Sequence, residues 1–184
     1  SKLSYITAEN TGVSQFPGNF AVLAPAALKS TAIADVKAET AYKFGFVQGT
    51  LGKTLYLTGV VSGRYLETTE KAELAVDVYV EAVEGGHKIY ILDGEAKKYL
   101  DVYFNADSKL SLQFNAEGAC VFAYNATVNA WVTNVDGTDY YVGTYSNFAT
   151  MSASKLSYIT AENTGVSQFP ANFFVQEVKE VGPV

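Results

Sequence analysis

The chain is poor in the residues that carry most enzyme chemistry. It has one cysteine, Cys120, so no disulfide can form within the chain, and one histidine, His87. No serine or cysteine nucleophile motif accompanies that histidine, and no second Cys or His lies at metal-ligand spacing from Cys120. We therefore expect no enzyme activity, no catalytic residues, no metal site and no cofactor. His87 is predicted to be a surface or turn residue, and Cys120 a small buried hydrophobe.

Positive charge and long apolar runs are also scarce. Lys and Arg together number 13 against 19 Asp and Glu, which gives a net charge of -6. Such a surface repels a phosphate backbone, so we expect no nucleic-acid partner. No run of 18 apolar residues occurs, so we expect no membrane insertion. The chain begins at Ser1, and we expect a mature or excised fragment.

Helical periodicity is confined to the alanine-rich stretch 24–41, "APAALKSTAIADVKAETA". A short helix starting at Pro25 suits this stretch, because proline is favoured in the first helical turn. One or two extended stretches fit it equally well. We interpret residues 24–41 as a connector.

Alternating apolar and polar residues dominate the sequence from Tyr42 onward, and aromatic residues make up 14% of the chain. Both features are typical of strands in an all-β protein. Turn-forming residues separate the alternating segments, as at Asp93-Gly94 and Asp136-Gly137. Strands are predicted at 53–59, 64–70, 76–83, 87–94, 97–104, 109–114, 120–125, 130–135, 139–146, 155–160 and 172–178.

Three predicted hairpins share one form. Their central residues, nine apart each time, are Tyr56 and Tyr65, Tyr90 and Tyr99, and Val132 and Tyr141. A further apolar strand follows each hairpin, after a stretch that holds one more strand in the second and third cases. In the first case that stretch holds only "KAELAV". The pattern predicts three units of four strands.

This pattern resembles the β-trefoil superfamily, and is similar to its fascin-like and lectin-like members, over roughly residues 44–178. The Gln-x-Trp element of ricin-type lectins is missing, and the single tryptophan, Trp131, lies in a first strand instead. A β-sandwich or another barrel gives similar strand spacing and stays an alternative. The resemblance implies that the first and last strands are neighbours. Residues 44–48 and 173–178 read alike, so we expect one to fill the closing position and the other to lie beside it.

The chain carries the same twenty residues twice. Residues 1–20, "SKLSYITAENTGVSQFPGNF", return as residues 154–173 with a single change, Gly18 to Ala171. We predict an N-terminal extension at 1–41 (the duplicated segment 1–23 plus the connector), a trefoil-like module at 42–178 and a C-terminal tail at 179–184. Three explanations stay open: a tandem array of similar modules, exchange of the segment between chains, and an engineered duplication.

The repeat makes connection between modules the leading function. We expect a structural, self-assembling module of an extracellular fibre, filament or virion appendage, located outside the cell or on a cell or virion surface. Its partners would be identical or homologous modules in a head-to-tail homo-oligomer. The expected subunit interface consists of apolar residues of the first copy, namely Leu3, Tyr5, Ile6, Val13, Phe16 and Phe20.

The alternative function is a carbohydrate-binding, lectin-like module with glycans as partners. Tyrosine and tryptophan offer large rigid contact areas with a polar group at the edge. The candidate ligand platform consists of Tyr99, Trp131, Tyr140 and Tyr145. Core packing is the competing interpretation for Tyr65, Tyr99 and Tyr141, which recur at one place in each unit.

Overall fold

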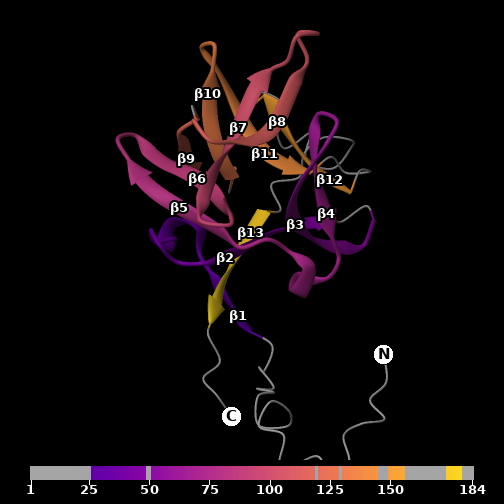
Figure 1. The fold of residues 1–184 in the computed structure, drawn as a ribbon, viewed down its shortest axis with the longest axis vertical. Coiled ribbons are helices and arrows are strands. Elements are labelled where there is room, and N and C mark those ends of the chain that lie inside the picture. The colour runs from indigo at the N-terminus through magenta and orange to yellow at the C-terminus, as the bar shows by residue number, and fades with distance from the viewer. Residues whose placement is uncertain are drawn as a thin grey trace, which may run out of the picture. The chain divides into compact units, whose positions relative to one another are not determined.

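The computed structural model describes residues 26–48, 51–118, 120–128, 130–144, 149–155 and 173–179, and nearly all of them belong to one compact unit, residues 28–178. These residues form a 13-stranded antiparallel sheet with two short 3-10 helices, and no α-helix occurs among them (Figure 1). The prediction of an all-β protein is confirmed. Within the described ranges, no helix is long and apolar enough to cross a membrane.

The elements follow in chain order. They are β1 (Ala27–Thr31), η3 (Ile33–Asp35), β2 (Tyr42–Gln48), β3 (Lys53–Ser62), β4 (Tyr65–Thr69), η4 (Ala72–Leu74), β5 (Val78–Val83), β6 (Gly86–Asp93), β7 (Ala96–Phe104), β8 (Leu110–Asn115), β9 (Phe122–Asn125), β10 (Ala130–Val135), β11 (Thr138–Thr144), β12 (Thr150–Lys155) and β13 (Phe173–Lys179).

Most predicted strands are found within a few residues of their expected positions. The predicted strand at 155–160 lies outside the described residues except for Lys155, which ends β12. Strand β12 itself was not predicted, because Ser152, Ala153 and Ser154 are small and carry little of the bulky apolar signal of a strand. All three are buried, since β12 lies between β11 and β4.

The sheet closes on itself. Its strands follow the order β1-β13-β2-β3-β4-β12-β11-β10-β9-β6-β7-β8, and β5 joins β2 to β6. Pairings recur at intervals along the chain: β2 with β3, β6 with β7, and β10 with β11. Strand β5 also pairs with β6, β9 with β10, and β13 with β2.

The predicted hairpins differ in register. Tyr90 lies opposite Tyr99, and Val132 opposite Tyr141. Tyr56 lies opposite Thr69 rather than Tyr65, because β3 continues to Ser62 and the turn lies directly before Tyr65, which pairs with Ser62. The first predicted hairpin is therefore not equivalent to the other two. The pairing that matches them is β2 with β3, in which Gly45 lies opposite Tyr56.

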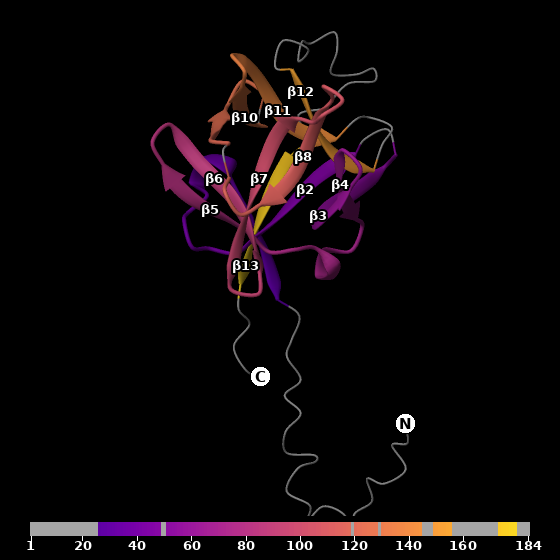
Figure 2. The ribbon, with the colours of Figure 1, turned by 45° about the horizontal axis from the view of Figure 1, so that its top comes forward.

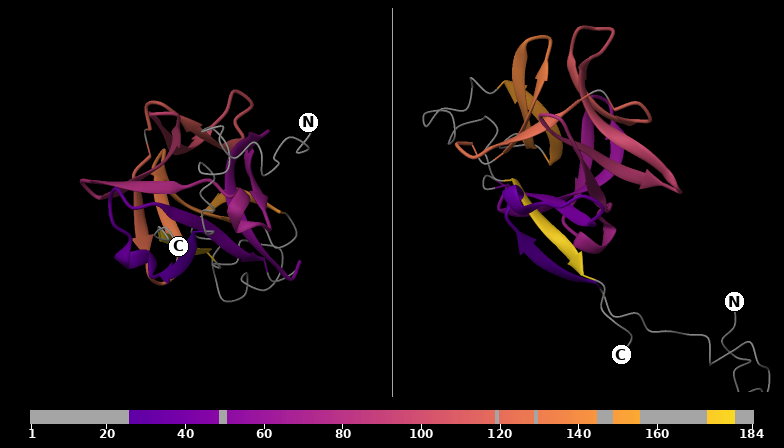
Figure 3. Two further views of the ribbon diagram at one scale, coloured as in Figure 1. Left: turned by 60° about the horizontal axis from the view of Figure 1, so that its bottom comes forward. Right: turned by 90° about the vertical axis from the view of Figure 1, so that its left-hand side faces the viewer.

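The two segments that read alike, in β2 and β13, pair with each other. Phe173 lies opposite Phe46 and packs against the rings of Phe44 and Phe46, with ring centroids 5.1 and 5.4 Å apart. Strand β1 lies along the other side of β13 (Figure 3). The connector thus supplies a strand, and its Ile33 and Val36 are buried with the core.

The core is formed by alternate residues of most strands. Its largest fully buried side chains are Trp131, Tyr42, Tyr141, Phe44, Phe46, Phe122, Leu55, Leu57, Leu66, Ile89 and Leu100. Three strands far apart in sequence, β4, β8 and β12, contact one another (Figure 2). Their meeting place forms the candidate site.

Candidate functional site

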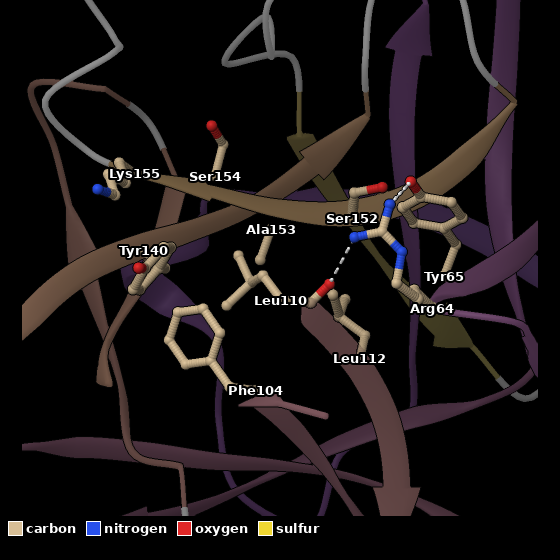
Figure 4. A pocket seen from close by; sticks show the side chains of 10 residues that line it. All are labelled: Arg64, Tyr65, Phe104, Leu110, Leu112, Tyr140, Ser152, Ala153, Ser154 and Lys155. Carbon is tan, nitrogen blue, oxygen red and sulfur yellow. Dashed lines mark hydrogen bonds between the residues drawn. The ribbon is translucent and has the colours of Figure 1, made fainter. Parts of the chain in front are cut away.

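A pocket of about 230 Å³ lies where β4, β8 and β12 meet, and we call it the hairpin pocket. Its polar lining residues are Arg64, Tyr65, Ser152, Ser154 and Lys155. Its apolar lining residues are Phe104, Leu110, Leu112, Tyr140 and Ala153. Arg64, Tyr65 and Ser152 lie on one side of the pocket, and Phe104, Tyr140 and Lys155 lie on the other (Figure 4). The pocket therefore has a polar end and an end that is mainly aromatic.

Arg64 is held by the turn between β3 and β4. Gly63, with φ of 63°, takes the left-handed conformation that this turn requires. The carbonyl oxygen of Arg64 accepts the Leu112 amide at 3.0 Å, which ties the turn to β8. The guanidinium donates through Nη2 to the Tyr65 hydroxyl at 2.7 Å and through Nη1 to the Leu110 carbonyl at 3.4 Å.

These contacts fix the guanidinium without neutralising it. In the part of the chain that the structure describes, Arg64 forms no ion pair with a carboxylate. A guanidinium has more N–H donors than the two contacts use. Arg64, the chain's only arginine, is thus a preorganised cation at the pocket, with donors that no described residue uses.

Ser152 places a hydroxyl in the pocket wall. The residue is 2% exposed, and its Oγ has no hydrogen-bond partner among the described residues. Leaving such a group unsatisfied costs about 1–3 kcal/mol. Buried polar groups almost always have hydrogen-bond partners. We therefore infer that the Ser152 hydroxyl binds a group outside the described residues.

The aromatic end is formed by Phe104 and Tyr140. Phe104 ends β7 and stays 42% exposed, although it is one of the largest apolar residues. Its ring meets the buried Tyr140 ring edge-on, with centroids 6.1 Å apart. Because it lines the pocket and stays exposed, the Phe104 ring offers apolar surface to a ligand there.

The lining of the pocket is positively charged in an acidic chain. It contains Arg64 and Lys155 and no Asp or Glu. Among the described residues, Lys155 forms no ion pair. A concave site lined by one sign of charge concentrates ions of the opposite sign. The pocket therefore favours an anion.

The predicted ligand platform is not assembled in one place. Trp131 is 1% exposed and packs edge-on against His87, with ring centroids 5.3 Å apart. Tyr140 is buried but lines the hairpin pocket. Tyr99 lies in a separate cluster, described next, and Tyr145 lies outside the described residues. Only Tyr140 therefore belongs to the candidate site.

Tyr99 belongs to a cluster on β5, β6 and β7 that we call the tyrosine ladder, formed by Tyr79, Tyr90, Tyr99, Glu81 and Lys97. Tyr90 stacks on Tyr79 and meets Tyr99, with centroids 5.4 and 5.7 Å away. Lys97 Nζ lies 4.5 Å from the Tyr90 centroid and 2.6 Å from Glu81 Oε2. The Tyr99 hydroxyl donates to the same carboxylate oxygen at 3.1 Å.

The pKa directions agree with this pairing. The hydrogen bond from Lys97 lowers the pKa of Glu81, and the same bond raises the pKa of Lys97. Burial raises the pKa values of Tyr79 and Tyr99. The ladder thus pairs its two charged groups and the Tyr99 hydroxyl with one another, and it offers little to a ligand.

The single histidine and the single cysteine of the chain pack among other residues of the fold. Burial lowers the pKa of His87, which starts β6 beside Trp131. Cys120 is buried, as predicted, and burial raises its pKa. Its backbone amide donates to Asp101 Oδ1 at 3.0 Å. Within the described ranges, no group of three or more His, Cys, Asp or Glu is placed to hold a metal ion.

The predicted subunit interface lies outside the described residues, because Leu3, Tyr5, Ile6, Val13, Phe16 and Phe20 all belong to residues 1–25. Sequence reasoning missed the hairpin pocket. A single arginine directly after a turn glycine, Gly63-Arg64, was the available signal. The convergence of β4, β8 and β12 that makes it a site has no local signature.

No family model, curated protein or solved structure matches this chain.

Proposed function

We propose that residues 42–178 form a β-trefoil. The support is the recurrence of pairings: first with second strand (β2–β3, β6–β7, β10–β11) and fourth strand with the next first strand (β5–β6, β9–β10, β13–β2). First and fourth strands of one unit also pair in β2–β5 and β6–β9. In this assignment the units begin at β2, β6 and β10.

We further propose that the chain is a non-enzymatic structural module, joined to related modules outside the cell through the duplicated segment. The observation that carries this is the place of β1 and β13. In the sequence, the first copy ends shortly before β1, and the second copy ends at Phe173, the first residue of β13. Strands β1 and β13 are neighbours in the sheet. One copy therefore ends inside this module, and the other copy directly precedes it.

The residues of β13 favour a tandem array over exchange between chains. Phe174 lies opposite Gly45, where an added Cβ would come within 2.3 Å of the Phe174 ring. Its ring also meets Tyr56 edge-on, with centroids 5.7 Å apart. The position is shaped for phenylalanine, but the residue after the first copy is Ala21.

A second mismatch lies farther along the strand. The Val178 amide donates to the Ala41 carbonyl at 2.9 Å, whereas the corresponding residue after the first copy is Pro25, which has no amide hydrogen. Losing the half-buried Phe174 contact and this hydrogen bond costs about 2 kcal/mol or more, over tenfold in population. The first copy therefore fits an identical module poorly. We infer that it is the tail of a preceding, related module.

A fusion tests this array. Residues 24–153 are placed ahead of Ser1, so that the first copy follows the same strands that the second copy follows in this chain. A second fusion also carries A21F and P25V, which restore the two mismatched residues. We expect a second cooperative unfolding transition by calorimetry, stronger in the second fusion. A control with residues 1–23 scrambled should lack it. If neither fusion gains a folded unit, the proposal is wrong.

The second candidate function is ligand binding at the hairpin pocket, in line with the lectin-like alternative. The observation that favours it is the free guanidinium donors of Arg64 beside the unpartnered Ser152 hydroxyl. Titration of the full chain with a panel of sugars and small acids tests it, with chemical-shift changes at residues 104 and 140 as the readout. Absence of binding by every compound tested would contradict it.

A further inference from the structure

We propose that the hairpin pocket binds a small carboxylate attached to a six-membered ring. This inference rests on the second candidate function, ligand binding at the pocket, and names its ligand class. It is independent of the array proposal.

The polar end selects the carboxylate. A guanidinium pairs with a planar carboxylate through two parallel N–H···O bonds. Arg64 is held in one place by Tyr65 and Leu110 and retains free donors. Ser152, buried and unpartnered in the described chain, adds a hydroxyl donor on the same side of the pocket (Figure 4).

The charge at this end matches a single negative charge. Arg64 is the only cation there, because Lys155 lies at the other end of the view in Figure 4. A phosphate group is more highly charged and is usually held by several cations or by a row of backbone amides. A monoanionic carboxylate therefore fits better than a phosphate.

The aromatic end selects a compact ring. Phe104, Tyr140 and Ala153 present apolar surface away from Arg64 (Figure 4). The volume of about 230 Å³ lies below that of pockets for drug-sized ligands, roughly 300–1,000 Å³. One ring fills this space, and the rest of a longer ligand would lie outside it. Either the apolar face of a sugar or an aromatic ring can contact Phe104.

Two sources supply this chemistry, a hexuronic acid of an acidic glycan and a free aromatic acid. Calorimetric titration of the full chain with glucuronate, galacturonate and benzoate distinguishes them. Glucose and benzamide are the neutral controls for the two rings. We expect at least one acid to bind about tenfold more tightly than its neutral control, because hydrogen bonds to charged groups are the strong ones.

Variants locate the binding. We expect R64Q to weaken acid binding by about tenfold or more and R64K to retain part of it, since lysine keeps the charge but not the fork. S152A should weaken it several-fold. K71Q removes an equal charge outside the pocket and should leave binding unchanged. Thermal unfolding of each variant checks that the fold is retained.

The outcomes separate the two ideas. Equal binding of acids and neutral controls, with loss in R64Q, would overturn the carboxylate and keep the pocket as a ligand site. Acid binding unchanged in both R64Q and S152A would place it elsewhere and overturn the inference. No binding of any acid at millimolar concentration would also overturn it.

Discussion

The tyrosine ladder and the hairpin pocket are built from the same kinds of group, and they differ in what they leave unpaired. In the ladder, Glu81 accepts from both Lys97 and Tyr99, and the rings stack on one another. In the pocket, Arg64 has no carboxylate among the described residues and Ser152 has no partner there. Aromatic residues and cations together therefore do not mark a site by themselves, and the pocket differs from the ladder in the polar groups that it leaves without partners among the described residues.

The largest expected effect comes from disturbing the ladder at Gly118. This residue has φ of 57°, and an added Cβ would lie 2.4 Å from Tyr99 Cβ. We expect G118A to lower the free energy of unfolding by about 2–4 kcal/mol, through backbone strain and displacement of Tyr99. Urea unfolding measures it.

Gly94 supplies the matched control for that variant. It has φ of 62° and open space around it, so G94A should cost only about 1 kcal/mol from backbone strain. Equal losses of stability in G118A and G94A would mean that the contact with Tyr99 contributes nothing. The packing of the ladder would then not explain its stability.

Removing one hydroxyl from each region gives a smaller, more direct contrast. Y99F deletes a hydroxyl that donates to Glu81 and should cost about 1 kcal/mol. S152A deletes a buried hydroxyl with no partner among the described residues, and should leave stability unchanged or raise it slightly. Both are measured by chemical unfolding. A clear loss of stability in S152A would show that its hydroxyl is already satisfied.

The smallest effect is the pH dependence of the ladder. The pKa of Glu81 is lowered in the folded state by the Lys97 hydrogen bond. Its contribution is therefore present above the unfolded pKa, about 4.3, and is lost as pH falls through the folded value. We expect wild type to lose more stability than E81Q on acidification from about pH 5 to 3, by less than 1 kcal/mol for this exposed pair.

That pH effect can be read by thermal unfolding of both proteins across the range. Identical pH profiles of stability for wild type and E81Q would mean that Glu81 does not cause the pH dependence.

The strands were largely predictable, because alternation and turn residues are local signals. Asp136 and Gly137, for example, both take positive φ in the β10–β11 turn. The register of β3 and β4 was not predictable, since it depends on an irregularity between Leu57 and Val61. Near that shift, Gly59 takes φ of 81°.

The candidate site was hidden for a different reason. Trp131 suggested a surface platform, but burial depends on which strands cover it, and it lies in the core. Ser152 sits in a strand of mostly small residues that lacks the β-branched and aromatic residues typical of strands. Arg64 and Ser152 lie far apart in sequence, so only the approach of β4 to β12 brings them together.

The boundary of the second copy has a consequence for how such a chain can change in length. The copy begins at Ser154 and Lys155, which line the hairpin pocket, and ends at Phe173, which anchors β13. The first copy begins with the same Ser-Lys pair and also ends in phenylalanine. In the proposed array, unequal recombination anywhere within the shared residues would add or remove a whole module, while each junction would keep the same Ser-Lys pair and the same terminal phenylalanine. The number of modules would then change without changing the chemistry of the proposed binding site.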